Sequence, residues 1–316
     1  MGATVQLRDR IGRRMKLQDL HVLITVVEAG SMGKAAQRLN TTQPNISRSI
    51  AELEQTFGVR LLDRHRQGIE PTECGRALIN CGVAVFDDLR QGVKNVEFLA
   101  DPTTGEVRIG NTLTSAAGFI AGVVDRLARR YPRMVFHVVP GAQDALRREL
   151  NERHVDLVIT RGGGLQDEKF GFETLYDDSY VVLAGAQNPW ARRRRIKLAE
   201  LVNEPWTLAP PESLGGAVMA AFRASGLDYP RAALVSDSAE VRMSLVAGGR
   251  FLTIAPSSLL RLHTGRAELK ILPVQLPMKR LPVVIATLKD RALGPVAKLF
   301  IQHAHEAAKP LGKKKR

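Results

Sequence analysis

The feature that most constrains this chain is a short helix with a polar first turn, contained in residues 41–57, TTQPNISRSIAELEQTF. Its apolar residues recur at helical spacing, so they share one face that must be buried. These residues are Ile46, Ile50, Leu53 and Phe57. Pro44 suits a first turn, because the N–H that proline lacks would have no helical partner there. The spacing therefore predicts a helix whose polar tip points away from the core.

Two other helices are expected just before it. Residues 17–28, LQDLHVLITVVE, are dense enough in apolar side chains for a helix buried on more than one side. Ser31 can cap the next helix, which runs to Leu39, and Thr42 is a second N-cap candidate for the polar-tipped helix. Two short helices with a polar tip on the second are typical of a helix-turn-helix that enters the DNA major groove. The alternative is an exposed amphipathic helix in an ordinary bundle.

The side chains of the tip and of the following segment are of types that bind DNA. Gln43 and Asn45 can pair with base edges, and Arg48 can reach guanine or phosphate. Residues 59–75, VRLLDRHRQGIEPTECG, predict a short hairpin with a basic tip, as in the wing of a winged helix. The predicted DNA-binding residues are Ser31, Lys34, Thr42, Gln43, Pro44, Asn45, Ser47, Arg48, Arg64 and Arg66.

Residues 25–75 resemble the opening of LysR-type transcriptional regulators nearly throughout. The shared positions are Val27, Glu28, Gly30, Ser31, Ala35, Ala36, Leu39, Gln43, Pro44, Ile46, Ser47, Ile50, Leu53, Glu54, Gly58, Leu61, Arg64, Gly68, Thr72 and Gly75. Leu62 replaces the usual Phe of the wing, and Asn45 stands where alanine is frequent, which can alter base preference. The resemblance implies a DNA-binding domain over residues 15–73, preceded by an extension, residues 1–14, that we expect to be disordered.

Residues 73–100 predict one long helix. Its apolar residues alternate steps of three and four, which is typical of a helix that pairs with a copy of itself. They are Ile79, Val83, Phe86, Leu89, Val93 and Val96. The resemblance makes residues 74–104 the linker helix and hinge of a homodimer or homotetramer. Cys74 and Cys81 lie about 10 Å apart along the axis, too far for a disulfide within the helix, and a redox switch is a minor alternative.

From Gly105 onward, strand-like and helix-like segments alternate, which predicts an α/β fold with parallel sheets. The strand-like segments are 107–110, 134–139, 156–160, 180–185, 206–210, 251–256 and 283–288, and the helix-like ones are 116–130, 143–153, 216–225 and 239–247. Residues 105–308 resemble the two-lobed effector-binding domain of the same family, which is similar to periplasmic binding proteins. We expect lobe 1 at 105–161 and 266–308, lobe 2 at 162–265, and a basic tail at 309–316.

Ligands in such folds bind at the carboxyl ends of strands and at helix N-termini, where free N–H groups favour anions. We therefore expect a small anionic effector, an organic or sugar acid. Its predicted contacts are Asn111, Thr112, Thr114, Ser115, Thr160, Arg161, Ser213, Gly215 and Ser238. The alternative is that these hydroxyl groups only cap helices. Arg250 either binds an acidic effector or faces solvent.

The net charge of +14 does not by itself locate a DNA site. Residues 1–100 contain 14 Lys and Arg against 11 Asp and Glu, which leaves +11 for the remainder. The excess includes Arg192–Arg195, Lys197 and the end of the chain, Lys313–Arg316. The simplest interpretation of these runs is a solvated loop and a disordered end.

Two other classes of protein are disfavoured. An enzyme is disfavoured because the seven histidines are scattered and residues 161–164, RGGG, lack the Lys-Ser/Thr of a phosphate-binding loop; we predict no metal and no cofactor. A transport binding protein is disfavoured by the helix-turn-helix and by a beginning unlike a signal peptide. With no apolar run near the 18 or so residues that span a bilayer, we expect a cytoplasmic regulator without membrane contact. The resemblance adds RNA polymerase as a further partner.

Overall fold

A computed structural model describes residues 15–65, 68–112, 117–162, 165, 167–261 and 268–312. The chain divides into two compact units, Met1–Gly92 and Val93–Arg316, which are described separately. Several predictions lie outside the described residues. They concern residues 1–14, Arg66, Thr114, Ser115 and residues 313–316.

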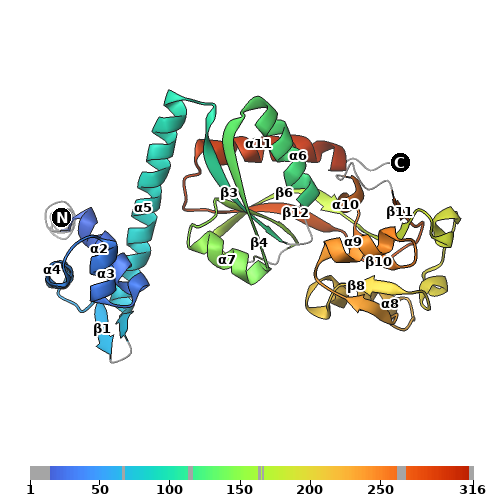
Figure 1. Ribbon diagram of the computed structural model, residues 1–316, viewed down its shortest axis with the longest axis horizontal. Helices are drawn as coiled ribbons and strands as arrows, with labels where there is room; N and C mark the ends of the chain where they lie inside the picture. Colours follow the sequence, from blue (N-terminus) through green and yellow to red (C-terminus); the bar gives the residue numbers. More distant parts are fainter. Residues whose placement is uncertain are drawn as a thin grey trace. The chain divides into compact units, whose positions relative to one another are not determined.

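The first unit is a three-helix core with a hairpin and the beginning of a long helix. Its elements are α2 (Leu17–Ala29), α3 (Met32–Arg38), α4 (Gln43–Phe57), β1 (Leu62–His65), β2 (Gly68–Pro71) and α5 (Glu73–Ala100) (Figure 1). The strands β1 and β2 are antiparallel, and Ile46, Ile50 and Leu53 are buried against α2 and α3. This arrangement confirms the winged helix-turn-helix that the apolar spacing predicts.

Helix α5 begins and ends at the residues expected from the sequence. Only part of its apolar seam is free, because Ile79 packs on the core of the first unit and the Phe86 ring lies 5.7 Å from His21. Gly82 has a role within its own chain, since an added Cβ would lie 3.1 Å from Ile24 Cδ1 of α2. The close approach of α5 to α2 therefore accounts for a glycine that would otherwise only weaken the helix.

Lobe 1 of the second unit is a five-stranded sheet in the order β4-β3-β5-β12-β6. Helices α6 and α11 cover one face, and α7 covers the other (Figure 1). The elements are β3 (Thr104–Thr112), α6 (Ala117–Arg130), β4 (Arg133–Gly141), α7 (Gln143–Asn151), β5 (Leu157–Arg161), β6 (Phe170–Asp178), β12 (Leu281–Leu288) and α11 (Pro295–Gly312).

Lobe 2 is a second five-stranded sheet, ordered β11-β7-β10-β8-β9. Helix α8 packs on one face and α9 on the other. The elements are β7 (Tyr180–Gly185), η2 (Pro189–Arg192), η3 (Leu198–Leu201), β8 (Trp206–Leu208), η4 (Pro211–Gly215), α8 (Gly216–Ala224), β9 (Ala232–Val235), α9 (Ala239–Ala247), β10 (Leu252–Pro256), α10 (Ser258–Arg261) and β11 (Leu269–Ile271).

Three expectations about this unit are wrong. The sheets are mixed, because β12 is antiparallel to β5 and β6, and β7 is antiparallel to β10 and β11. The chain crosses to lobe 2 after Asp178 and returns after Ile271, because β6 belongs to the first sheet and β11 to the second. The expected crossings at 161–164 and 263–266 each fall one strand too early. At the end of the chain α11 continues to Gly312, past the expected start of the tail at 309.

Candidate functional site

The tip of α4 presents the polar side chains that the sequence singles out. Thr42, Gln43, Asn45 and Arg48 are exposed, while Ile46 is buried at 1% exposure on the opposite face. Asn45 Nδ2 donates to Thr41 Oγ1 at 3.2 Å, which holds its amide at the helix start. Pro44 also is exposed, and Ser47 is half-buried. The tip therefore offers amide, hydroxyl and guanidinium groups to a ligand.

The two expected N-caps have different outcomes. Ser31 Oγ accepts a hydrogen bond from Lys34 N at 3.1 Å, so the cap of α3 is confirmed. Thr42 occupies the N-cap position of α4, but its side chain makes no capping hydrogen bond, and that part of the prediction is wrong. Pro44 has no N–H to be capped, and the other backbone donors of the first turn lack helical acceptors. Such donors can bind an anion.

Two hydrogen-bonded junctions fix the wing, one to α4 and the other to the start of α5. Glu54 Oε1 accepts from Leu61 N at 2.8 Å and from Leu62 N at 3.2 Å, so a carboxylate of α4 fixes the start of β1. Thr72 Oγ1 donates to Arg60 O at 2.8 Å and accepts from Gly75 N at 3.0 Å. Glu54, Thr72 and Gly75 of the motif thus hold the backbone of the wing in place, although none of them is predicted to contact DNA.

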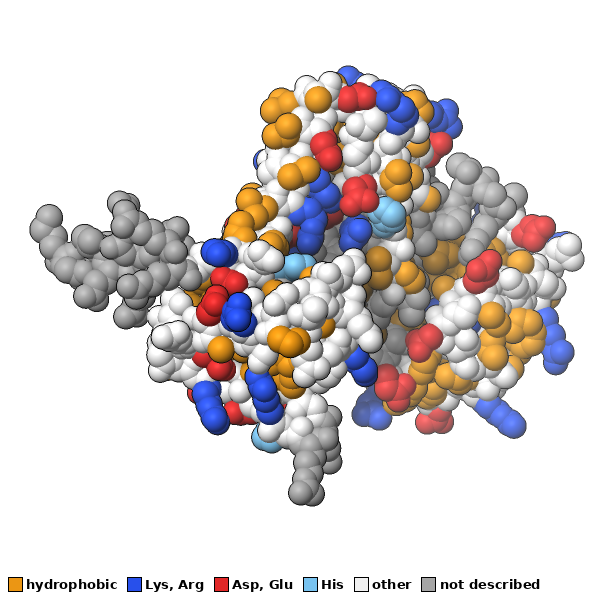
Figure 2. Space-filling model, turned by 60° about the vertical axis from the view of Figure 1, so that its left-hand side comes forward, with side chains coloured by type: hydrophobic (Ala, Val, Ile, Leu, Met, Phe, Trp, Pro, Cys, Tyr) orange, Lys and Arg blue, Asp and Glu red, His pale blue; other side chains and the backbone are white. Residues whose placement is uncertain are grey.

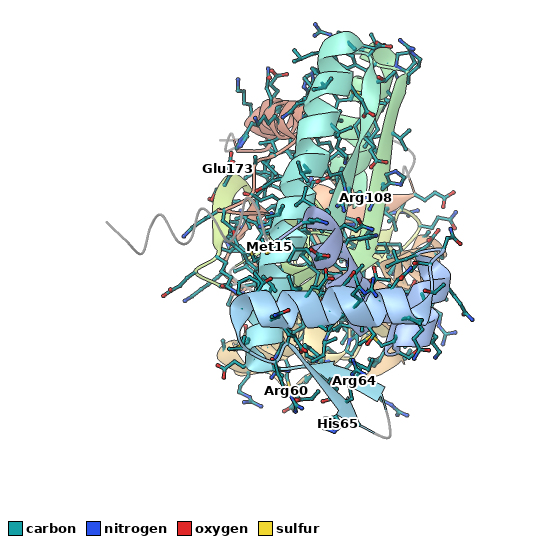
Figure 3. The ribbon with its side chains drawn as sticks, turned by 90° about the vertical axis from the view of Figure 1, so that its left-hand side faces the viewer. Met15, Arg60, Arg64, His65, Arg108 and Glu173 are labelled. Carbon is teal, nitrogen blue, oxygen red and sulfur yellow. The ribbon has the colours of Figure 1, made fainter. Side chains whose placement is uncertain are left out.

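The wing adds cations on the same unit. Arg64 and His65 are exposed on β1, and Arg60 is exposed just before it. Figure 3 shows these three side chains together at the hairpin end of the unit. Sequence reasoning assigned Arg64 and overlooked Arg60, although its position directly before an apolar strand could have indicated it.

The predicted effector contacts of lobe 1 lie at the carboxyl ends of β3 and β5, on two faces of the sheet. Side chains alternate along a strand, so Asn111 lies on the same face of β3 as the buried Val107 and Ile109, which is the face that α6 covers. Thr160 lies on the same face of β5 as Val158, which is the face that α7 covers, and Thr112 is on that face of the sheet as well. Within the described residues, Asn111 Oδ1 and Thr160 Oγ1 are buried without a hydrogen-bond partner. Buried polar atoms of this kind usually acquire a partner, which a bound ligand or water can supply.

Arg161, at the end of β5, belongs to a buried ionic network. Its Nη2 lies 2.5 Å from Asp178 Oδ2, and its guanidinium lies 5.2 Å from the centre of the Tyr180 ring. Asp178 also accepts from Ser257 Oγ at 2.9 Å and from Ser258 N at 3.2 Å. Since Ser257 and Ser258 follow β10 of lobe 2, Asp178 connects the two lobes. The charge of Arg161 is already neutralised there, and its contact with an effector stays a prediction.

Tyr176 on β6 lies beside this network. Burial, and next the neighbouring negative charge of Asp178, raise the pKa of Tyr176 to about 12. Both effects disfavour the phenolate, so the hydroxyl remains protonated at neutral pH. The junction between the two lobes thus contains a neutral phenol next to a matched ion pair.

The lobe 2 candidates lie at the corresponding edge of the second sheet. Ser213 Oγ donates to Pro210 O at 3.1 Å, and Ser238 Oγ accepts from Val241 N at 3.3 Å as the cap of α9. Both side chains are exposed, whereas Gly215 is buried and packs on the Ala209 carbonyl. The strands β8 and β9 are parallel, so Ser213 and Ser238 follow strands that end at one edge. Helix α10, which follows β10, packs against α6 of lobe 1.

Arg242 of α9 is a residue of this edge that sequence reasoning missed. It is 1% exposed, and its Nη1 donates to Ser236 O at 2.5 Å. Burial lowers the pKa of Arg242, and the nearby Asp237 opposes this shift. Its position among Val241 and Met243 in a mostly apolar helix was the available signal. Through its hydrogen bond to Ser236 O, the buried Arg242 side chain stabilises the loop between β9 and α9.

Two general properties bear on the class of protein. In the described part of the chain, no group of three or more His, Cys, Asp or Glu residues could hold a metal ion. Among the same residues, no helix combines the length and apolar character needed to cross a membrane.

A winged helix-turn-helix joined through a long helix to a two-lobed α/β unit defines a ligand-responsive, DNA-binding transcription regulator. The family models agree: residues 17–76 match the bacterial regulatory helix-turn-helix protein of the lysR family, and residues 100–309 match the LysR substrate binding domain. The chain belongs to the LysR family of transcriptional regulators. It is a regulator and not an enzyme.

Individual relatives match along most of the chain. The regulator GbpR of Azospirillum brasilense is 27% identical over 288 residues, 90% of this chain and 84% of that protein. AlsR of Bacillus subtilis is 28% identical over 77% of this chain and 81% of its own length. A full-length OxyR variant from Pseudomonas aeruginosa has the same fold, with a TM-score of 0.64 and 19% identity over 96% of this chain and 98% of that one. CbnR in complex with its target DNA has a TM-score of 0.53 and 22% identity over 93% and 100%.

Proposed function

We propose that this regulator binds promoter DNA through the α4 tip and the wing, and that a small anionic effector alters that binding. The observation that carries the DNA part is the division of α4 into a buried apolar face and an exposed polar tip. Gln43 and Asn45 contact base edges, Arg48 contacts guanine or phosphate, and Ser47 bonds to either. Arg64 and Arg66 contact phosphates or the minor groove, and Ser31 and Lys34 contact phosphates beside α3.

The exposed part of α5 supports a dimer as the DNA-binding species. Leu89, Val93 and Val96 are 49%, 56% and 67% exposed and share one face of the helix. A second copy of α5 would remove these apolar side chains from water. The resulting dimer places two α4 tips on two half-sites, and two such dimers form a tetramer on a bent promoter.

The effector binds between the carboxyl edges of the two sheets. Asn111, Thr112, Thr114, Ser115, Thr160 and Arg161 contribute from lobe 1, and Ser213, Gly215 and Ser238 contribute from lobe 2. The helix N-termini at these edges favour an organic or sugar acid over a neutral molecule. Binding shifts the populations of lobe conformations around the Asp178 network. The change in promoter DNA alters access for RNA polymerase in the cytoplasm.

The DNA assignment is tested by sequencing the DNA that co-purifies with the tagged protein from cells. We expect a small set of promoter regions to be enriched, each with two related half-sites. Recovery of DNA in proportion to its genomic abundance would contradict the assignment. The genes next to the enriched regions also suggest the chemistry of the effector.

The effector assignment is tested by thermal unfolding of the full chain with dicarboxylates, sugar acids and their neutral amide or sugar counterparts. We expect an acid to raise the melting temperature, and Thr114→Ala to abolish the rise. Thr174→Ala, at an exposed position on β6, is the control and should leave it intact. A rise caused by the neutral compounds alone would reject an anionic effector, while a rise of full size in Thr114→Ala would reject that residue.

A further inference from the structure

Lobe 2 has a cationic surface that neither the DNA-reading head nor the effector site uses. It consists of Arg192–Arg195 and Lys197, between β7 and β8, and of Arg250, just before β10. We call these residues the arginine face. All of them are exposed.

The arginine face is held in place by the core of lobe 2. Asn188, only 3% exposed, accepts from Trp190 N at 2.9 Å and donates through Nδ2 to Gly249 O at 2.8 Å. The second bond ties the loop to the turn that carries Arg250. Ile196 and Leu198 are buried in the lobe 2 core on the other side of the arginines. The loop is thus already ordered on folding, unlike a freely solvated loop, so binding a ligand there costs little further entropy.

Most of these charges have no carboxylate partner among the residues that the structure describes. Arg193 pairs with Glu200 at 3.0 Å and lies over Trp190. For Arg192, Arg194 and Arg195, no carboxylate of the described residues lies within ion-pair distance. Elsewhere in this unit exposed arginines do face carboxylates, in the pairs Arg129–Asp125, Arg133–Asp101 and Arg147–Asp144. Figure 2 shows the same mixing of Lys and Arg with Asp and Glu over much of the face in view.

The arginine face is remote from the candidate effector edge. Strand β7 runs antiparallel to β10, with Tyr180 opposite Pro256 and Ala184 opposite Leu252. The chain after β7 therefore lies at the end of the sheet away from Ser257 and the Asp178 network. Figure 1 shows the segment that follows, drawn in yellow, at the outer end of lobe 2. Arg250 lies at this end too, so it does not face the candidate effector edge.

We propose that the arginine face binds phosphates of DNA that flanks the segment held by the winged helices. Guanidinium groups are planar, permanently charged and suited to bidentate binding of phosphate. The partner of this regulator is a polyanion, and +11 of the net charge of +14 lies after residue 100. The second unit thus contributes to DNA affinity directly, in addition to any response to an effector.

The test is the salt dependence of binding by the full-length protein to mixed-sequence duplexes of about 20 and about 60 base pairs. The variant replaces Arg192, Arg194 and Arg195 by Gln. A control variant replaces three exposed lysines of lobe 1, Lys169, Lys289 and Lys298, by Gln, and these substitutions remove the same amount of positive charge. A third variant replaces the three arginines by Lys and keeps the charge. Thermal unfolding verifies that all variants are folded.

The logarithm of the affinity decreases with the logarithm of the salt concentration. On the longer duplex, we expect this negative slope to become less steep by about 0.9 for each phosphate that the Gln variant no longer neutralises. On the shorter duplex the slope stays at the wild-type value, as it does for the Lys169 control variant on both lengths. The Arg→Lys variant keeps most of the slope. An unchanged slope on the longer duplex would overturn the proposal, as would an equal fall in the control variant or an equal fall on both lengths.

Discussion

Some single residues in the motif of residues 25–75 fix backbone positions, in addition to the residues for which DNA contacts are proposed. Gly75 shows this most clearly, because an added Cβ would lie 2.0 Å from Leu61 O. The wing and α5 meet at this point, where Thr72 N donates to the same Leu61 carbonyl at 3.0 Å. A side chain at position 75 must therefore push the wing away from the first turn of α5.

We predict that Gly75→Ala lowers the free energy of unfolding by about 1–3 kcal/mol, the range for overpacked sites. Gly92→Ala is the matched control on the same helix, because an added Cβ at Gly92 would meet no atom within 4 Å. That substitution should raise stability by up to about 1 kcal/mol, since alanine favours a helix interior. Urea unfolding of the two variants measures both effects. Equal stabilities would show that the close approach at Leu61 has no energetic importance.

At the scale of elements, α5 presents its own unpaired surface. The half of its seam near the first unit packs within the chain, while Val93 and Val96 remain more than half exposed. An exposed apolar row on a long helix is typical of a pairing surface.

We predict that Val96→Glu weakens self-association at least tenfold, or about 1.4 kcal/mol, because it introduces a carboxylate into the pairing surface. Asn95→Glu adds the same charge at the neighbouring exposed position, on a different side of the helix, and should leave association unchanged. Sedimentation of both variants over a range of concentrations measures the difference. If the two variants dissociate alike, α5 does not pair through this face.

In the second unit, the strands that sequence reasoning found and those that it missed differ in how they are buried. The apolar strands, such as β5 and β10, could be predicted because continuous burial leaves an unbroken apolar run, and α5 could be predicted because its apolar residues alternate steps of three and four. The missed strands, β6, β9 and β11, are all edge strands of their sheets. Edge strands are partly solvated, as the 44% exposure of Phe172 on β6 illustrates, and their apolar pattern is weak. Missing β6 and β11 also misplaced both crossings between the lobes.

The candidate sites were predictable to different degrees. The polar tip of α4 follows from local spacing, so its exposed residues could be assigned from the sequence. The network of Asp178 could not, because its partners Arg161 and Ser257 are 17 and 79 residues away and belong to segments of different sheets. Asn111 and Thr112 could not be separated by face either, because that requires the register of β3 and β5.

At the scale of the whole molecule, the two units have separable tasks. The first unit contributes the DNA-binding helix-turn-helix and its wing, and because its net charge is small, we predict that it binds DNA through the placement of single side chains. The second unit contributes the lobes, the Asp178 network between them, and the proposed arginine face. We predict that specific DNA recognition by this LysR-family regulator depends on the tip of α4.

That claim is tested most directly by the affinity of the full-length protein for one promoter fragment recovered from cells, measured by gel shift. Arg48→Ala should weaken binding about tenfold or more, because a guanidinium bound to guanine contributes about 1–3 kcal/mol. Arg129→Ala, which removes the same charge from the exposed surface of α6, should bind like the wild type. Wild-type affinity in Arg48→Ala would contradict the account.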